Sequence, residues 1–243
     1  MKQRMRVFAG PNGSGKTALV NQLIREGNKL INPNLHINPD DLNSADMLDF
    51  DNFGLKVDEN DFQDFVLNHH FYKALYLDIN DIKINDNCFK VVKKGSYMGA
   101  MLSDYLRDSL IRTNERLFSF ETVFSHPSKV DFLENAKNHG WDVYLYFVST
   151  ADHEINCARV VQRVLKGEHD VPEIKIRDRY IKTHDNLYPA LKHCRRAYIF
   201  DNSEDMKLIA EKKPDGSLDF SKEYPVPGWL NECLLSKLNE RLS

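Results

Sequence analysis

Apolar residues in this chain fall into two patterns, short continuous runs and stripes at helical spacing. Between the runs, segments such as "ALVNQLI" (18–24) and "SKVDFLENAKN" (128–138) repeat their apolar residues along one helix face. Strands that alternate with helices predict an α/β fold, with a parallel sheet covered by helices on both faces. The runs, rich in β-branched and aromatic residues, predict five strands at about 4–9, 35–38, 116–124, 141–149 and 196–203.

Two regions depart from this alternation. Residues 43–115 are a predicted helical insertion, because "DFQDFVLNHHFYKALYLDI" and "SYMGAMLSDYLRDSLIRTNE" place apolar residues at helical spacing and the stretch 43–94 has little strand character. After the fifth strand, "LIAEKKPDGSLDF" predicts a hairpin about a Pro-Asp-Gly turn, and residues 228–242 predict a final helix. We expect one domain over residues 1–243.

The junction between the first strand and the first helix reads "AGPNGSGKTALV" and contains the pattern G-x-x-x-x-G-K-[ST]. Glycines let the backbone wrap so that several N–H groups point at one anion, and the next helix adds its positive dipole end. The pattern therefore predicts a P-loop, or Walker A motif, that binds ATP or GTP. Lys16 would reach the β- and γ-phosphates, and the Thr17 hydroxyl would ligate Mg²⁺. The predicted nucleotide-binding residues are Gly10, Pro11, Asn12, Gly13, Ser14, Gly15, Lys16 and Thr17.

Acidic residues follow two of the predicted strands, at the sheet edge where ligands collect in such folds. Asp40 and Asp41 come after the second strand, and Glu121 and Thr122 end the third. Phosphoryl transfer needs a group that accepts the proton of the acceptor hydroxyl, and we favour Asp40 for this role over Asp41, which could cap a helix. Glu121 is a candidate for Mg²⁺, water or an acceptor hydroxyl, with a satisfied strand-end acid as the alternative.

Arginines mark a predicted lid over residues 159–180. Arg159 and Arg163 lie four residues apart on one helix face, and Arg177 and Arg179 lie on the helix that follows the loop 167–173. Two basic helices joined by a short loop can fold over a polyphosphate, although a solvated charged face would give the same pattern.

Taken together, "AGPNGSGKT", "INPDD", "FSFETVFSHPSK", "RVVQRVLKGEHDVPEIKIRDRY" with "NLYPAL", and "IFDNS" resemble the zeta-toxin-like P-loop kinases, a family also described as predicted ABC-type ATPases. The resemblance covers most of the chain, apart from residues 43–94 and the C-terminal tail. It implies ATP- or GTP-dependent phosphorylation of a nucleotide-activated amino sugar such as UDP-N-acetylglucosamine. It also implies an antitoxin protein as a partner, since the best-known members belong to toxin–antitoxin pairs.

The resemblance assigns roles to individual residues. Asp40 matches the acid that activates the acceptor, Glu121 and Thr122 match the substrate-holding region, and Arg163 and Arg179 match the catalytic lid arginines, with Arg159 beside the nucleotide. Two departures bear on the acceptor: "DDLNSADML" lacks the basic residue and His-Pro pair that follow the acid in the toxins, and no glycine separates Glu121 from Thr122.

Composition narrows the remaining classes. With 42% hydrophobic and 28% charged residues and a net charge of −3, the chain has a normal globular composition that argues against a whole-protein attraction to nucleic acid or membrane. Its four cysteines form no C-x-x-C pair, and no signal peptide precedes the first strand, so we expect a cytoplasmic protein. A nucleotide-driven switch and a nucleic-acid end kinase remain the alternatives to a small-molecule kinase.

Overall fold

The computed structural model describes residues 2–27, 29–167 and 170–239. The chain divides into two compact units, the first formed by Met1–Ile31 and Glu121–Ser243 and the second by Asn32–Phe120. Within the described residues, no helix combines the length and the apolar character needed to cross a membrane.

The first unit is built on a mostly parallel sheet. Strand β7 pairs in parallel with β1 on one side and with β8 on the other, and β9 and β10 continue the sheet as antiparallel strands. Strand β6 (Leu117–Thr122) ends in this unit, where the N–H of Gly10 donates to the carbonyl of Thr122 at 3.3 Å. The other strands are β1 (Arg4–Ala9), β7 (Asp142–Ser149), β8 (Arg196–Asp201), β9 (Lys207–Lys212) and β10 (Leu218–Phe220).

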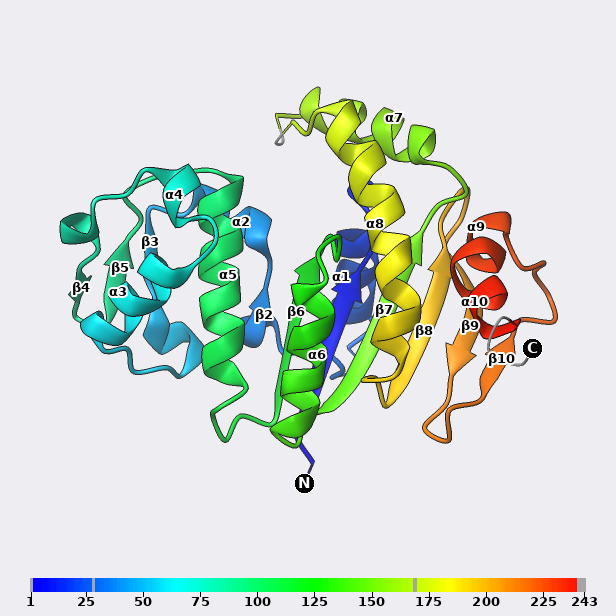
Figure 1. The fold of residues 1–243 in the computed structure, drawn as a ribbon, viewed down its shortest axis with the longest axis horizontal. Helices are drawn as coiled ribbons and strands as arrows, with labels where there is room; N and C mark the ends of the chain where they lie inside the picture. The colour runs from blue at the N-terminus through cyan, green and yellow to red at the C-terminus, as the bar shows by residue number, and fades with distance from the viewer. Residues whose placement is uncertain (1, 28, 168–169, 240–243) are drawn as a thin grey trace. The chain divides into compact units, whose positions relative to one another are not determined.

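Helices cover both faces of these strands (Figure 1). On one face, Leu19 and Val20 of α1 pack with Phe8, Tyr146 and Val148 of the strands. On the other face, α6 packs on β7 and on α8. The helices are α1 (Lys16–Arg25), α6 (Ser128–Asn138), α7 (His153–Val164), α8 (Glu173–Leu191), and a C-terminal run of α9 (Gly228–Leu230), a π-helical turn (Asn231–Leu235) and α10 (Ser236–Asn239).

The second unit has an aromatic core. The rings of Phe50, Phe89 and Tyr105 meet the ring of Phe62 edge-on, with centroids 4.7–5.7 Å apart. Strand β2 (His36–Ile37) pairs in parallel with β6. The unit also holds α2 (Pro39–Ser44), α3 (Glu59–Asn68), α4 (Tyr72–Leu75) and α5 (Ser96–Leu110), the strands β3 (Met47–Asp49), β4 (Ile84–Asn85) and β5 (Cys88–Lys90), and 3₁₀ turns at Pro33–Leu35, Phe50–Phe53 and Ile79–Asp81.

The α/β class is confirmed, and so are the five predicted strands and the hairpin β9–β10. The insertion differs from the prediction, because β3, β5 and β4 form a small antiparallel sheet in a stretch expected to have little strand. Its hairpin turns at Asp86 and Asn87, whose φ angles of 49° and 60° suit a two-residue turn that Asn and Asp tolerate. Residues 168 and 169 of the predicted lid and 240–242 of the predicted final helix lie outside the described residues.

Candidate functional site

The loop between β1 and α1 has the backbone that its glycines predict. Gly10 and Gly15 have φ angles of 153° and 102°, and a Cβ at Gly10 would overlap the carbonyl oxygen of Val148. Gly15 is the N-cap of the ten-residue helix α1, so the positive end of the helix dipole faces the loop. These features are typical of a loop that binds an anion.

Lys16 is the first residue of α1, and its side chain turns back over the loop. The Nζ atom donates to the carbonyl oxygens of Gly10 and Pro11, both at 2.9 Å. A cation held over the mouth of a glycine loop is the arrangement in which a lysine can contact the terminal phosphates of a nucleotide.

Thr17 on α1 and Glu121 at the end of β6 are joined by a hydrogen bond in which the threonine Oγ1 donates to Oε2 at 2.6 Å. Glu121 is 4% exposed, and it ends β6 beside the loop. Two hard oxygen ligands at one point beside a phosphate loop fit Mg²⁺, which binds through one or two protein oxygens and completes its shell with phosphate and water. Among the described residues, no cluster of three or more His, Cys, Asp or Glu side chains could hold a metal ion.

Thr122 is 7% exposed, and its side chain is engaged locally. Its Oγ1 accepts a hydrogen bond from the N–H of Phe124 at 3.1 Å, and its carbonyl accepts the bond from Gly10. The arrangement fixes the chain where β6 leaves the sheet, next to Glu121.

The four arginines of the predicted lid divide between α7 and α8. Arg159 donates through Nη2 to the carbonyl of Ser203 at 3.3 Å, and Arg179 donates through Nη1 to the Asn12 side chain at 3.3 Å. Arg163 is half-buried on α7, and Arg177 is exposed on α8. Arg179 is therefore bonded directly to a residue of the glycine loop.

Asp40 belongs to the second unit, near the start of α2. Its backbone N–H donates to the Asn38 side chain at 3.0 Å, and its carboxylate accepts a 3.4 Å hydrogen bond from Asn43. Its side chain is exposed. Asn38 is the N-cap of α2, so the alternative reading of Asp41 as a helix cap is wrong.

A second buried cluster lies where β7 and β8 end. His184 of α8 is hydrogen-bonded through Nε2 to the Ser149 hydroxyl at 2.7 Å and stacks on Trp229 at 5.0 Å. Burial lowers the pKa of His184 to about 4, against a smaller opposing effect of Asp185. The Trp229 Nε1 donates to Asp201 at 2.7 Å, which ties the C-terminal helices to the end of β8.

Two asparagines in the site have no counterpart among the predicted residues. Asn156 of α7 donates to the carbonyl of Asn12 at 2.5 Å, and Asn202, just after β8, donates to the carbonyl of Ser14 at 2.7 Å. Asn202 stands in the motif "IFDNS", which marked the strand end without indicating this contact, whereas no sequence signal singles out Asn156.

Comparison with known proteins identifies the fold. No family model matches the chain, and no curated protein matches it. The chain superimposes over 99% of its length on a chain of the AvrRxo1-ORF1:AvrRxo1-ORF2 complex with sulphate ions, with a TM-score of 0.58 and 14% identity. The same complex with ATP gives a TM-score of 0.55 at 13% identity over 99% of this chain. In both, the match spans 63% of the other chain.

A third structure, the PezAT chromosomal toxin–antitoxin system of Streptococcus pneumoniae, matches 100% of this chain and 89% of the other at 16% identity, with a TM-score of only 0.49. At 13–14% identity, the similarity to the AvrRxo1 complex chains shows a common fold and leaves activity open. The chain therefore has the α/β fold of the AvrRxo1 complex chain, with the glycine loop between the end of β1 and the start of α1.

Proposed function

We propose that this chain is a P-loop kinase, which transfers the γ-phosphoryl group of ATP or GTP to a hydroxyl group of a small molecule. The observation that carries the proposal is the hydrogen bond from Thr17 to Glu121 beside a glycine loop over which Lys16 is folded. Phosphoryl transfer relies on a phosphate cradle, a metal ion and positive charge. Lys16 supplies charge, and Thr17 with Glu121 would hold Mg²⁺, which neutralises the charge of the phosphates.

In the proposed reaction, the acceptor oxygen forms a bond to the γ-phosphorus while the bond from that phosphorus to the β,γ-bridging oxygen breaks. The nucleoside diphosphate leaves, and the proton of the acceptor hydroxyl passes to the Asp40 carboxylate. Arg163 and Arg179 stabilise the charge that develops on the transferred group. Arg159, bonded to the chain after β8, contributes to nucleotide binding.

We further propose that the acceptor is a nucleotide-activated amino sugar such as UDP-N-acetylglucosamine, held by Asp40, Glu121 and Thr122. This rests on the resemblance of the sequence motifs to the zeta-toxin-like kinases. The similarity to a chain from a two-protein complex, one form of which contains ATP, supports both nucleotide binding and a protein partner. That the partner is an antitoxin rests on the sequence resemblance alone.

One observation favours a second candidate, a nucleotide-hydrolysing switch. Glu121 is buried against Thr17, where a carboxylate could orient water toward the γ-phosphate. In that case the acceptor is water, and Asp40 plays no part.

A direct screen separates these functions. The purified protein is incubated with ATP and Mg²⁺ together with nucleotide sugars, nucleosides or oligonucleotides, and products are analysed by mass spectrometry, with Lys16→Ala as the control. We expect a phosphate adduct on a nucleotide sugar. Release of inorganic phosphate without an adduct would establish the switch instead, and an adduct on oligonucleotide ends would establish a nucleic-acid end kinase.

A further inference from the structure

The P-loop is held from outside its own motif by two asparagine side chains. Asn156, which is 0% exposed, donates through Nδ2 to the carbonyl oxygen of Asn12 at 2.5 Å. Asn202, which is half-buried, donates in the same way to the carbonyl oxygen of Ser14 at 2.7 Å. The two asparagines lie 144 and 188 residues from the loop residues they contact, so these bonds depend on the complete fold of the first unit.

Both asparagines are anchored at the end of β7. The Oδ1 of Asn156 accepts a hydrogen bond from the hydroxyl of Thr150, whose carbonyl in turn accepts the Tyr180 hydroxyl at 2.7 Å. The backbone N–H of Asn202 donates to the carbonyl of Ser149 at 2.7 Å. Because the sheet fixes Ser149 and Thr150, it also fixes the two amide groups that reach the loop.

The geometry of the peptide bond gives these contacts a consequence. In a trans peptide the C=O and N–H groups point in opposite directions, and the described residues contain no cis peptide bond. Holding the carbonyl of Asn12 therefore turns the N–H of Gly13 away from Asn156. Holding the carbonyl of Ser14 turns the N–H of Gly15 away from Asn202.

The glycines allow this close approach. A Cβ on Gly13 would lie 2.7 Å from the carbonyl oxygen of Asn156, and one on Gly15 would overlap the amide nitrogen of Asn202. The asparagines thus occupy one side of the loop, which leaves the two N–H groups directed to the other. Within the described part of the chain, neither N–H donates to a protein acceptor.

We propose that Asn156 and Asn202 are positioning residues of the nucleotide site, which aim the N–H groups of Gly13 and Gly15 at the phosphates of a bound nucleotide. The inference rests on the proposed nucleotide-binding function. It concerns binding alone, so it does not depend on the identity of the acceptor.

The test compares Asn156→Leu and Asn202→Leu with the parent and with Asn186→Leu. Asn186 is a matched control, because it is also buried and its Nδ2 also donates to a backbone carbonyl, that of Phe124 at 2.9 Å, outside the P-loop. Calorimetry gives the Kd of each protein for ADP, for inorganic pyrophosphate and for adenosine, and circular dichroism verifies folding. Asn202→Leu keeps the test decisive if Asn156→Leu does not fold, since Asn202 is less buried.

We expect the Kd for ADP and pyrophosphate to rise about 10-fold or more in each folded loop variant, on the scale of hydrogen bonds to charged groups, while the Kd for adenosine is unchanged. Asn186→Leu should bind all three probes like the parent. Parent-like ADP binding by folded Asn202→Leu, or an equal loss for ADP and adenosine, would overturn the positioning role and leave the nucleotide site standing. A parent protein that binds neither ADP nor pyrophosphate would overturn the proposed function, and the inference with it.

Discussion

The two units of the chain use polar side chains in different ways. In the first unit, polar groups from distant parts of the sequence converge on the P-loop, as Thr17 does with Glu121 and as Asn156 and Asn202 do with the loop carbonyls. In the second unit, polar side chains such as Glu59 and Gln63 bond to residues 25 and 19 positions away and join elements of the unit to one another. The polar groups of the first unit therefore meet at the glycine loop where we propose that a nucleotide binds, whereas those of the second unit join parts of that unit to one another.

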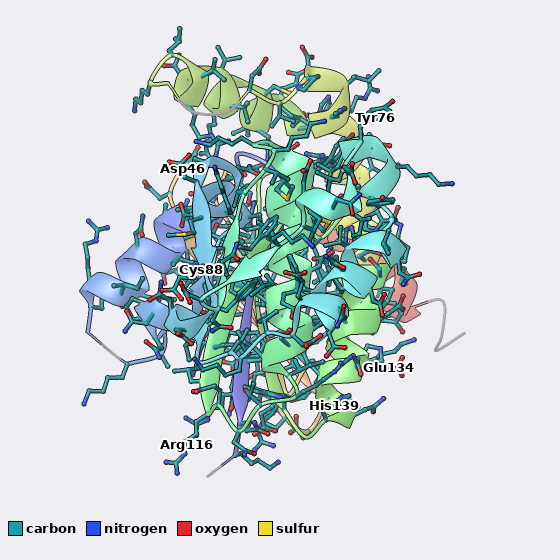
Figure 2. All side chains as sticks on the ribbon, turned by 90° about the vertical axis from the view of Figure 1, so that its left-hand side faces the viewer. Asp46, Tyr76, Cys88, Arg116, Glu134 and His139 are labelled. Atoms are coloured by element: carbon teal, nitrogen blue, oxygen red, sulfur yellow. The ribbon has the colours of Figure 1, made fainter. Side chains whose placement is uncertain are left out.

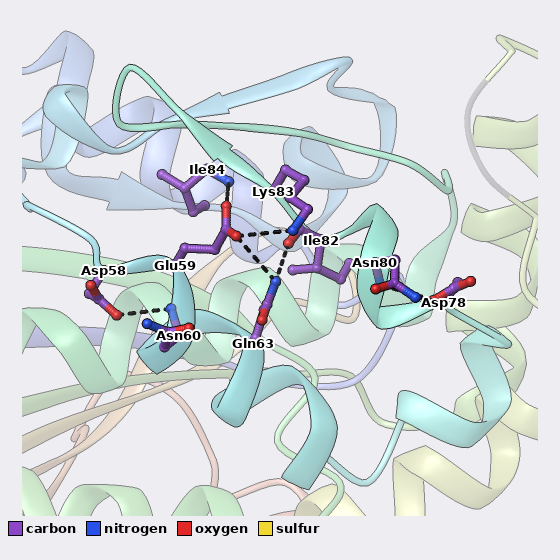
Figure 3. A network of polar contacts seen from close by, with 9 residues as sticks. All are labelled: Asp58, Glu59, Asn60, Gln63, Asp78, Asn80, Ile82, Lys83 and Ile84. Carbon is purple, nitrogen blue, oxygen red and sulfur yellow. Dashed lines mark hydrogen bonds and ion pairs between the residues drawn. The ribbon is translucent and has the colours of Figure 1, made fainter.

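The network around Glu59 illustrates the second pattern (Figure 3). Glu59 accepts a hydrogen bond from the N–H of Ile84 at 2.8 Å and pairs with Lys83 at 3.2 Å, while Gln63 donates to the carbonyl of Ile82 at 2.7 Å. The bond from Ile84 is the main reason that the pKa of Glu59 lies below its usual value. These contacts attach α3 to the chain at β4. We therefore interpret the network as structural and do not assign it a catalytic role.

Charge is also buried in the second unit, in α5. Arg107, 3% exposed, forms an ion pair with Asp104 and lies over the ring of Phe120 at 4.6 Å. Burial lowers the pKa of Arg107 to about 10, which leaves the guanidinium charged at neutral pH. By contrast, Tyr76 is 89% exposed and Asp46 is also on the surface (Figure 2), so large and charged side chains of this unit occur in both settings.

The largest effect should come from Lys16→Ala, which tests whether the glycine loop of the first unit is the site of phosphoryl transfer. We expect turnover of ATP to fall by about 10³-fold, because the lysine contributes charge stabilisation and makes little contribution to the core. Steady-state ADP release measures the effect, and the thermal unfolding midpoint should match that of the parent. Turnover at the parent rate would show that the loop is not the site of phosphoryl transfer.

Asp40→Asn compared with Glu121→Gln asks which unit supplies the reactive carboxylate. Asp40→Asn keeps size and hydrogen bonding but removes the proton acceptor, so we expect normal ATP affinity with acceptor phosphorylation reduced by about 10²-fold. Glu121→Gln should weaken Mg²⁺-dependent nucleotide binding, because Glu121 contacts Thr17 directly. Nucleotide affinity and product formation are measured for both. If Asp40→Asn transfers phosphate like the parent, Asp41 or Glu121 must take its role.

His184 offers a test of how the buried polar groups of the first unit respond to acid. Its pKa is about 4 in the folded protein against a usual 6.5, so the unfolded chain binds a proton more readily between these values. The contribution of neutral His184 to the free energy of unfolding should therefore be complete above pH 6.5 and be lost as the pH falls toward 4. Between pH 7 and 5 the parent should lose about 2 kcal/mol more free energy of unfolding than His184→Gln. Urea titrations at the two pH values measure this, and equal losses would contradict it.

Much of the first unit could be predicted from the sequence, because its signals are local. Glycine spacing predicted the loop, and continuous apolar runs predicted β1, β7 and β8. Local pattern also singled out Thr17 and Glu121 as candidate site residues, but it could not show that they are bonded to each other, because 104 residues separate them. The contacts of Asn156 and Asn202 with the loop were not predicted either, because they also join distant parts of the sequence. A single asparagine gives no periodic pattern, and only the fold determines its partner.

The second unit was harder to predict because its strands are only two or three residues long. Such segments are too short for an alternating pattern, and the turn at Asp86 and Asn87 lacks the glycine that marks a typical hairpin. The helical stripe of α5 was long enough to be recognised, and its Met98, Met101 and Leu102 are buried as expected of a core face.

The smallest effect we predict is on the transfer rate, when single arginines of the predicted lid are replaced. It tests how much α7 and α8 add to the glycine loop within the first unit. Four arginines on α7 and α8 share the charge, so we expect Arg163→Ala and Arg179→Ala each to lower the transfer rate at saturating ATP by about 10-fold, with a smaller change in ATP affinity. Arg179 is also bonded to the Asn12 side chain, so its loss should affect the loop as well.

Arg179→Lys separates the contribution of the positive charge from that of the guanidinium geometry, because lysine keeps the charge but lacks the planar fork of donors. A rate recovered in Arg179→Lys assigns the effect to charge, whereas no recovery assigns it to the planar donor geometry of the guanidinium group. Loss of nucleotide affinity alone, with the saturated rate unchanged, would mean that both arginines only bind the nucleotide.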